Sequence, residues 1–205
     1  MSKISKVIAR QVFDSRGNPT VEAEVFLDDG SHASAIVPSG ASTGSHEAFE
    51  LRDLDDKKYL GKSVFKALEK VNGEISQTLI GFSSNDQEKI DKALILLDNT
   101  KEKKRLGGNA TLSVSLAVCK AAAISKKIPL YKNIGNKKTL PVPLMNIING
   151  GVHANNSLRI QEFMIRPDKA KSFKEAINIC FLVIQKLKSQ LNNNNLSTTV
   201  GDEGG

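Results

Sequence analysis

Residues 141–167, with the sequence PVPLMNIINGGVHANNSLRIQEFMIRP, constrain the fold more than any other stretch of the chain. Residues 141–148 predict a buried strand, because most are apolar and a proline stands first, where a missing N–H is tolerated. Residues 161–165 predict a second strand with an alternating pattern. Between them, the glycines at 150–151 let the backbone turn sharply and approach whatever lies at the strand end. We therefore expect two strands on either side of a turn that can hold functional side chains.

His153 and Glu162 are the candidate functional side chains of this stretch. A histidine in a loop is often only solvated, and a glutamate at a strand start is often an edge charge. Glu162, however, lies in an otherwise apolar run, where an ionised carboxylate is costly unless it is paired or bound to a cation. Asp202 and Glu203 add two acids between glycines, just after a β-prone segment at 197–199. Catalytic groups of α/β folds often stand at such strand ends.

The first forty residues predict a β-meander. Residues 4–13 are β-prone, and residues 20–27 alternate strictly between apolar and polar side chains. Asp29-Gly30 predicts a hairpin turn. Residues 33–37 continue the inward face as a third strand, which stops at Pro38.

Two polar segments border this meander. Residues 14–19, DSRGNP, predict a turn whose Arg16 is either solvated or holds a carboxylate or phosphate, and the sequence does not separate these alternatives. Residues 39–47, SGASTGSHE, are either a plain flexible connection or a loop that wraps an anion and closes over a site.

Three helices are expected after the meander. Apolar residues repeat at helical spacing over 64–79 and 84–97, and Ser84 with Gln87 predicts a capping box for the second helix. The third is expected over 109–128, with one apolar stripe and with alanines small enough to pack closely against a sheet. The stripe consists of Leu112, Leu116, Cys119 and Ala123. Sheet first and helices after predict an α+β domain over residues 1–134.

Residues 172–191 predict a further, strongly amphipathic helix, capped by Ser172 with Glu175 at the third position. Together with the flanking segments, residues 141–201 read as strand, strand, helix and strand. We therefore expect a second domain over residues 141–205.

Composition excludes several function classes. Lys and Arg total 29 against 22 Asp and Glu, which gives a net charge of +7 and a pI near 9.4. The lysines are scattered in pairs and aromatic residues make up only 5%, so we expect no nucleic-acid binding. Cys119 and Cys180 lack metal-ligand spacing and are expected to be reduced core residues of a cytoplasmic protein. No targeting peptide or membrane span is visible.

Several segments resemble those of one known family, the enolases, and occur in that family's order. They are NGGVHANN, QEFMIRP and VGDEGG, together with VPSGASTGSHEA at 37–48 and DSRGNPTVE at 14–22. The resemblance implies an enolase N-terminal α+β domain over residues 1–134. It implies that residues 141–205 form the first ββαβ portion of an enolase-type TIM barrel, so the expected fold class combines α+β and α/β.

The resemblance also implies roles for individual residues. Glu203 would be the general acid, and Glu162 would position the leaving hydroxyl or share its proton. Gln161 would contact the substrate, and His153 would close on the phosphate side of that substrate within a second mobile loop. Ser39 would contribute ligands to the second of two magnesium ions.

The implied activity is the reversible dehydration of 2-phosphoglycerate to phosphoenolpyruvate, a lyase step of glycolysis, in a homodimer or larger homo-oligomer. In the family, the metal-binding carboxylates and the catalytic lysine come from later barrel strands than residues 141–205 supply. We therefore expect the amino-terminal part of an enolase, truncated in its second domain and inactive on its own. The alternative is a non-catalytic truncated product that serves as a binding or dimer-contact module.

Overall fold

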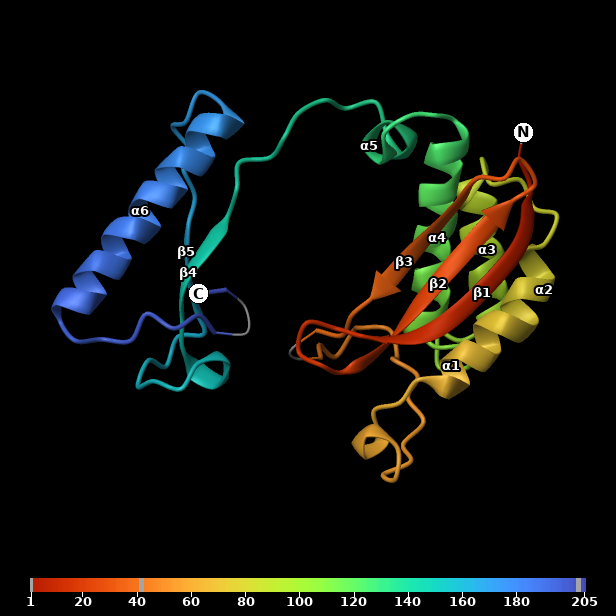
Figure 1. Cartoon of the computed structure of the whole chain (residues 1–205), viewed down its shortest axis with the longest axis horizontal. Helices are drawn as coiled ribbons and strands as arrows, with labels where there is room; N and C mark the ends of the chain where they lie inside the picture. Colours follow the sequence, from red (N-terminus) through yellow and green to blue (C-terminus); the bar gives the residue numbers. More distant parts are fainter. Residues whose placement is uncertain (1, 41–42, 202–203) are drawn as a thin grey trace. The chain divides into compact units, whose positions relative to one another are not determined.

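The computed structural model describes residues 2–40, 43–201 and 204–205. The chain divides into two compact units, Met1–Asn136 and Lys137–Gly205, which are described separately (Figure 1).

The first unit is built on a three-stranded antiparallel sheet in the order β1-β2-β3. The strands are β1 (Ile4–Phe13), β2 (Pro19–Leu27) and β3 (His32–Val37). Alternation in β2 puts Val21, Ala23 and Val25 on one face, where each is fully buried. The predicted meander is therefore present, with its inward face as the sequence indicated.

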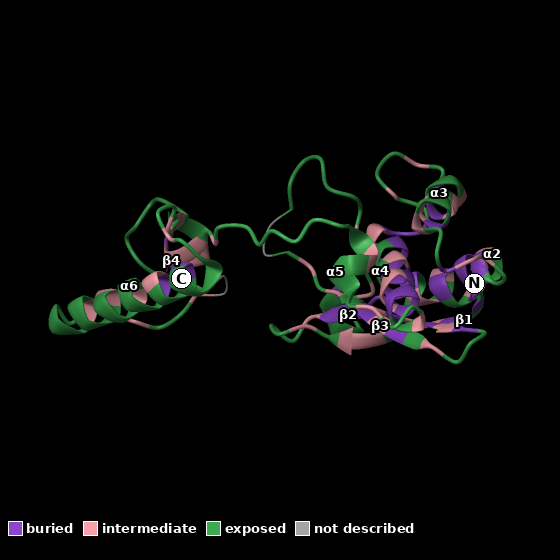
Figure 2. Cartoon of the chain, turned by 90° about the horizontal axis from the view of Figure 1, so that it is seen from above, coloured by how far each residue is buried: buried purple, intermediate pink, exposed green. Residues whose placement is uncertain are grey.

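The helical elements of this unit are η1 (Tyr59–Gly61), α1 (Phe65–Lys70), η2 (Val71–Ile75), α2 (Ser76–Leu79), α3 (Gln87–Asp98), α4 (Gly108–Ser125) and α5 (Leu130–Ile134). Of these, α1, η2 and α2 contact β1, and α4 contacts β2 and β3. The predicted helix over 64–79 forms, but its middle turn, η2, is a π-helix. Figure 2 shows the buried residues gathered where these helices meet the sheet.

The face that α4 turns toward the sheet is the alanine side, as the sequence predicted. Leu112 and Leu116, in the expected stripe, are 48% and 41% exposed, while Ala117 and Ala121 are fully buried. The helix packs against β2 and β3. A close approach to a sheet favours the side of the helix with the smallest side chains, and the leucines are left on the other side.

The N-cap residue of α3 differs from the predicted one. Asp86 is the N-cap, and its carboxylate accepts a hydrogen bond from the Lys89 N–H at 3.0 Å. Ser84 is instead buried, with its hydroxyl 2.9 Å from that of Ser2. The tertiary hydrogen bond takes the serine away from the capping role.

The second unit contains two paired strands and one long helix. Its elements are β4 (Met145–Asn149), η3 (Gly151–His153), β5 (Glu162–Ile165) and α6 (Phe173–Asn193). The strands pair antiparallel, and Ser172 caps α6 by accepting a hydrogen bond from the Glu175 N–H at 3.1 Å. Both features were predicted, but β4 begins at Met145 where a buried strand was expected from residue 141, and Val142 and Leu144 are 45% and 62% exposed.

The third strand that was expected in this unit does not form among the described residues. Residues 196–201 have no regular secondary structure. A strand needs a neighbour that takes its backbone hydrogen bonds, and no described residue of the chain pairs with this segment. The described part of the unit is therefore ββα, and no barrel closes within it.

Two further expectations concern single features. Cys119 is partly buried, Cys180 is fully buried, and both are free thiols. Within the described ranges, none of the helices is both long and apolar enough to cross a membrane.

Candidate functional site

Glu162 begins β5 and lies directly opposite Asn149, the last residue of β4. Its side chain is partly buried. Around this pair, the Gly150 N–H donates to the carbonyl of Gln161 at 2.9 Å, and the Gly151 N–H donates to that of Leu158 at 2.7 Å. The glycine crossing and the start of β5 are therefore held against each other by backbone hydrogen bonds.

The closeness of this contact explains why a glycine stands at position 150. A Cβ on Gly150 would lie 2.7 Å from the Leu158 Cβ and 3.0 Å from its carbonyl oxygen. Gly151 has φ +59, the left-handed region that disfavours most side chains. The two glycines turn the chain into η3, which ends at the partly buried His153.

The segment at 201–205 folds back onto the same place. The Gly201 N–H donates to the Gly205 carbonyl at 2.8 Å, which closes a short turn. A Cβ on Gly205 would overlap the Asn149 side chain, and one on Gly201 would lie 3.0 Å from the His153 carbonyl oxygen. Asp202 and Glu203, the two acids that the sequence places in this segment, lie outside the described residues.

Asn149 is the buried centre of the arrangement, with 3% of its surface exposed. Its Oδ1 accepts from Asn146 Nδ2 at 2.5 Å, and its carbonyl accepts from Asn156 Nδ2 at 2.9 Å. Its own Nδ2 is buried without a hydrogen-bond partner within the described ranges. The end of β4, the start of β5 and the described glycines Gly201 and Gly205 therefore meet at this residue.

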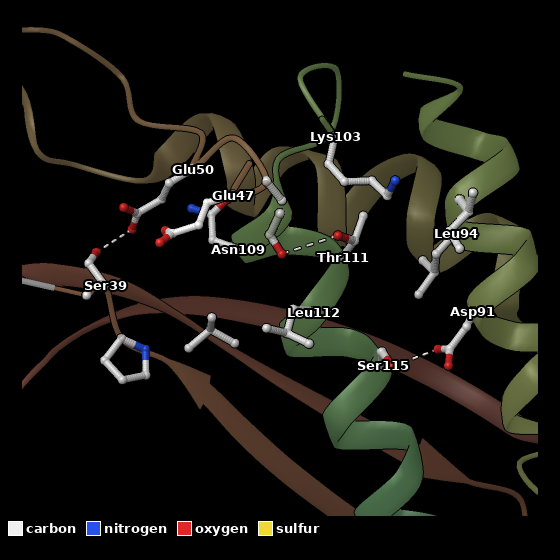
Figure 3. A pocket seen from close by; sticks show the side chains of 16 residues that line it. Ser39, Glu47, Glu50, Asp91, Leu94, Lys103, Asn109, Thr111, Leu112 and Ser115 are labelled. Carbon is white, nitrogen blue, oxygen red and sulfur yellow. Dashed lines mark hydrogen bonds between the residues drawn. The ribbon is translucent and has the colours of Figure 1, made fainter. Parts of the chain in front are cut away.

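Ser39, in the first unit, belongs to a separate cluster. Its hydroxyl donates to Glu50 Oε1 at 2.5 Å and accepts from Arg52 Nη2 at 2.7 Å. Arg52 also pairs with Glu50 at 2.8 Å. Ser39 and Glu50 are among the residues that line a cavity of about 560 Å³. Figure 3 shows the hydrogen bond between their side chains.

Arg16 reaches the same loop from the turn between β1 and β2. Asp14 orders this turn by accepting hydrogen bonds from the N–H groups of Asn18 and Arg16, which lowers the pKa of its carboxyl group. The Arg16 guanidinium donates to the carbonyls of Ser39 at 2.7 Å and Gly40 at 3.1 Å. Of the alternatives that the sequence left open for Arg16, the structure supports a carboxylate contact, because Arg16 Nη2 lies 3.7 Å from Asp14 Oδ2 while the same guanidinium also donates to the two backbone carbonyls.

Comparison with known proteins decides the family. The family described as "Enolase, N-terminal domain" matches residues 4–134, and "Enolase, C-terminal TIM barrel domain" matches residues 137–205. The chain belongs to the enolase family. The enolase of Pelagibacter ubique (strain HTCC1062) is 62% identical over 207 aligned residues, which cover all of this chain and 49% of that protein. The chain therefore spans about half the length of this curated relative.

Membership of the enolase family implies a bound magnesium ion, so the question is whether the described residues could hold one. They contain no group of three or more His, Cys, Asp or Glu side chains that could hold a metal ion. The oxygens of Ser39 are already engaged by Glu50, Arg52 and Arg16, two of which are cations. The described residues therefore do not form a magnesium site by themselves.

The predicted enolase site residues fall into two groups. His153, Gln161 and Glu162 lie together around the β4–β5 end of the second unit, and Ser39 lies in the first unit. Sequence reasoning missed Glu50 and Arg52, which contact Ser39. The segment 48–53, AFELRD, could have signalled them. Glu50 and Arg52 carry opposite charges and are two residues apart, so their side chains lie on the same side of an extended chain and can pair.

Proposed function

We propose that this chain supplies part of the active site of an enolase that interconverts 2-phosphoglycerate and phosphoenolpyruvate. The observation that supports it best is the meeting of three segments at Asn149: the end of β4, the start of β5 and the turn at 201–205. These are the segments on which the family resemblance places its acid and substrate contacts.

The reaction removes a proton from the carbon next to the carboxylate and expels hydroxide from the neighbouring carbon. Hydroxide leaves readily only when an acid protonates it. We assign that proton to Glu203, so that the leaving group departs as water. Glu162 orients the leaving hydroxyl or shares its proton, and crowding of the two carboxylates favours the protonated form of one of them.

The remaining assignments concern binding. Gln161 contacts the substrate, and His153, on a short η3 turn, closes on the phosphate side. Ser39 is assigned to the second magnesium ion on the family resemblance alone. The base that takes the carbon-bound proton is assigned to a lysine that the family carries on a later strand.

The wider assembly belongs to the same proposal. Residues 1–134 act as the enolase N-terminal α+β domain, and residues 141–205 act as the start of its barrel. The cofactor is Mg²⁺, the partner is a second copy of the chain in a homodimer or larger homo-oligomer, and the location is the cytoplasm.

A chimera tests this function. Residues 1–205 replace the matching half of the Pelagibacter ubique enolase, and phosphoenolpyruvate formation from 2-phosphoglycerate is followed by absorbance with excess magnesium. The chimera is expected to turn over, and the 205-residue chain alone is expected not to. A chimera that folds and forms its oligomer but makes no phosphoenolpyruvate would contradict the proposal.

The non-catalytic alternative has one observation in its favour. The first unit holds a core of its own, in which Val21, Val25, Ile75, Leu79 and Val118 are all fully buried. A unit of this kind can fold and present a contact surface without the barrel. Self-association of residues 1–205 in analytical ultracentrifugation, together with an inactive chimera, would favour this alternative.

A further inference from the structure

The loop at 39–47 leaves the sheet after β3 and rejoins the helical part of the first unit near Arg52. The structure describes its residues 39–40 and 43–47. Its first residue is joined to the segment that follows the loop, because the Arg52 guanidinium donates to the Ser39 hydroxyl at 2.7 Å across thirteen positions of sequence. The start of the loop is therefore fixed by a side chain in addition to the backbone that leads into it.

Glu50 contacts both of these side chains, so Ser39, Glu50 and Arg52 form a triangle of hydrogen bonds. Its Oε1 accepts from the Ser39 hydroxyl at 2.5 Å and from Arg52 Nη2 at 2.8 Å. The side chains of Arg52 and Glu50 are only 16% and 33% exposed. A partly shielded carboxylate with two donors forms stronger hydrogen bonds than a neutral acceptor would.

Arg52 is itself anchored to the rest of the unit. Its Nη1 donates to the carbonyl of Pro19 at 3.1 Å, at the start of β2, and to the carbonyl of Lys62. The planar guanidinium can make these bonds and the bonds to Glu50 and Ser39 at once, whereas an ammonium group has no such fork. The triangle is thus held in place by the sheet.

Ser39 gains a defined geometry from these contacts. A hydroxyl has one donor position and two acceptor positions. Glu50 takes the donor position and Arg52 takes one acceptor position, which together fix the direction of the second lone pair. The carbonyl of Ser39 is held separately by Arg16 at 2.7 Å.

We propose that Glu50 and Arg52 are positioning residues, which hold Ser39, where the loop 39–47 begins, against the segment that follows the loop before any ligand binds. The arrangement is a property of the first unit. Only the role of Ser39 in magnesium binding rests on the proposed function.

Limited proteolysis of the 205-residue chain by thermolysin, without substrate or magnesium, tests the proposal. The rate of cleavage between residues 39 and 48 is measured for the parent chain, Glu50→Gln and Arg52→Lys. Glu88→Gln is the matched control, because Glu88 pairs with Lys92 on the exposed surface of α3. We expect the two loop variants to be cut roughly tenfold faster, the factor for losing one charge-assisted hydrogen bond, and the control to be cut at the parent rate.

A double-mutant cycle separates positioning from general destabilisation. If Glu50 acts through Ser39, then Glu50→Gln adds little to the cleavage rate in a Ser39→Ala background. Unchanged cleavage in Glu50→Gln, a full additive effect in the Ser39→Ala background, or an equal rise in cleavage throughout the first unit would each overturn the proposal. None of these readouts depends on turnover, so a failure of the proposed enolase activity is a separate result.

Discussion

Asn109 and Leu51 are joined by two hydrogen bonds that mimic a strand pairing. The Leu51 N–H donates to Asn109 Oδ1 at 3.1 Å, and Asn109 Nδ2 donates to the Leu51 carbonyl at 3.0 Å. The neighbouring Gly108 N–H donates to the Phe49 carbonyl at 2.7 Å. The first turn of α4 therefore holds the segment that follows the loop 39–47, beside the triangle of Ser39, Glu50 and Arg52.

Asn109→Ala is expected to lower the free energy of unfolding of the first unit by about 1–3 kcal/mol, because two partly buried backbone groups of Leu51 lose their partners. Urea denaturation followed by circular dichroism measures the loss. Asn85→Ala, at an exposed asparagine, is the matched control and should change the free energy of unfolding by less than about 0.5 kcal/mol. Equal losses in the two variants would show that the amide of Asn109 has no special role.

The ionisation of Asp98 should make the free energy of unfolding depend on pH. Burial of its carboxylate opposes ionisation, but hydrogen bonds from Thr100 and from the Leu106 N–H outweigh it, so the pKa of Asp98 lies below its ordinary value. A lowered folded-state pKa stabilises the fold above the unfolded-state value of about 3.9, and this stabilisation is lost as pH falls through the folded-state pKa.

The test compares Asp98→Asn with the parent chain across pH. At pH 7 the variant should be less stable by about 1–3 kcal/mol, and the difference in free energy of unfolding should shrink between about pH 5 and pH 2. Asp56→Asn removes an exposed carboxylate and serves as the control. A difference for Asp98→Asn that stays constant over this range would show that ionisation of Asp98 does not stabilise the fold.

Gly150, in the second unit, is a position where a larger side chain should be costly, and Gly135, near the end of the first unit, is its control. A Cβ on Gly150 would lie 2.7 Å from the Leu158 Cβ, whereas one on Gly135 would meet nothing within 4 Å. Gly150→Ala should therefore force a backbone shift that costs about 1–3 kcal/mol and speeds hydrogen exchange over residues 145–165. Gly135→Ala should leave that exchange unchanged. Slow exchange retained in Gly150→Ala would mean that the crossing is looser than described.

Local patterns predicted much of the fold. The strict alternation of 20–27 fixed both β2 and its buried face, and the repeat over 172–191 with Ser172 before it predicted α6 and its cap. For these segments, one element's own sequence carries the periodicity and the capping residue. The segments around His153 and Glu162 were identified by their resemblance to enolases, and the roles of these two residues stay predictions.

Tertiary contacts decided what the sequence left open or indicated wrongly. Ser84 was predicted to cap α3, but its hydroxyl contacts that of Ser2, and Asp86 takes the capping position instead. Residues 197–199 are β-prone, but no described segment pairs with them. Arg16 and Arg52 contact Ser39 from positions 23 and 13 residues away, and no local pattern signals a contact of that kind.

We propose that Glu203 supplies the acid of an enolase site at the end of β4 and the start of β5. The most direct test is the turnover number of the chimera with Glu203→Gln, beside Glu88→Gln as a remote control on α3. We predict a loss of at least about 100-fold for Glu203→Gln, as for removal of a general acid, and an unchanged rate for Glu88→Gln. A chimera with Glu203→Gln that turns over at the parent rate would contradict this account.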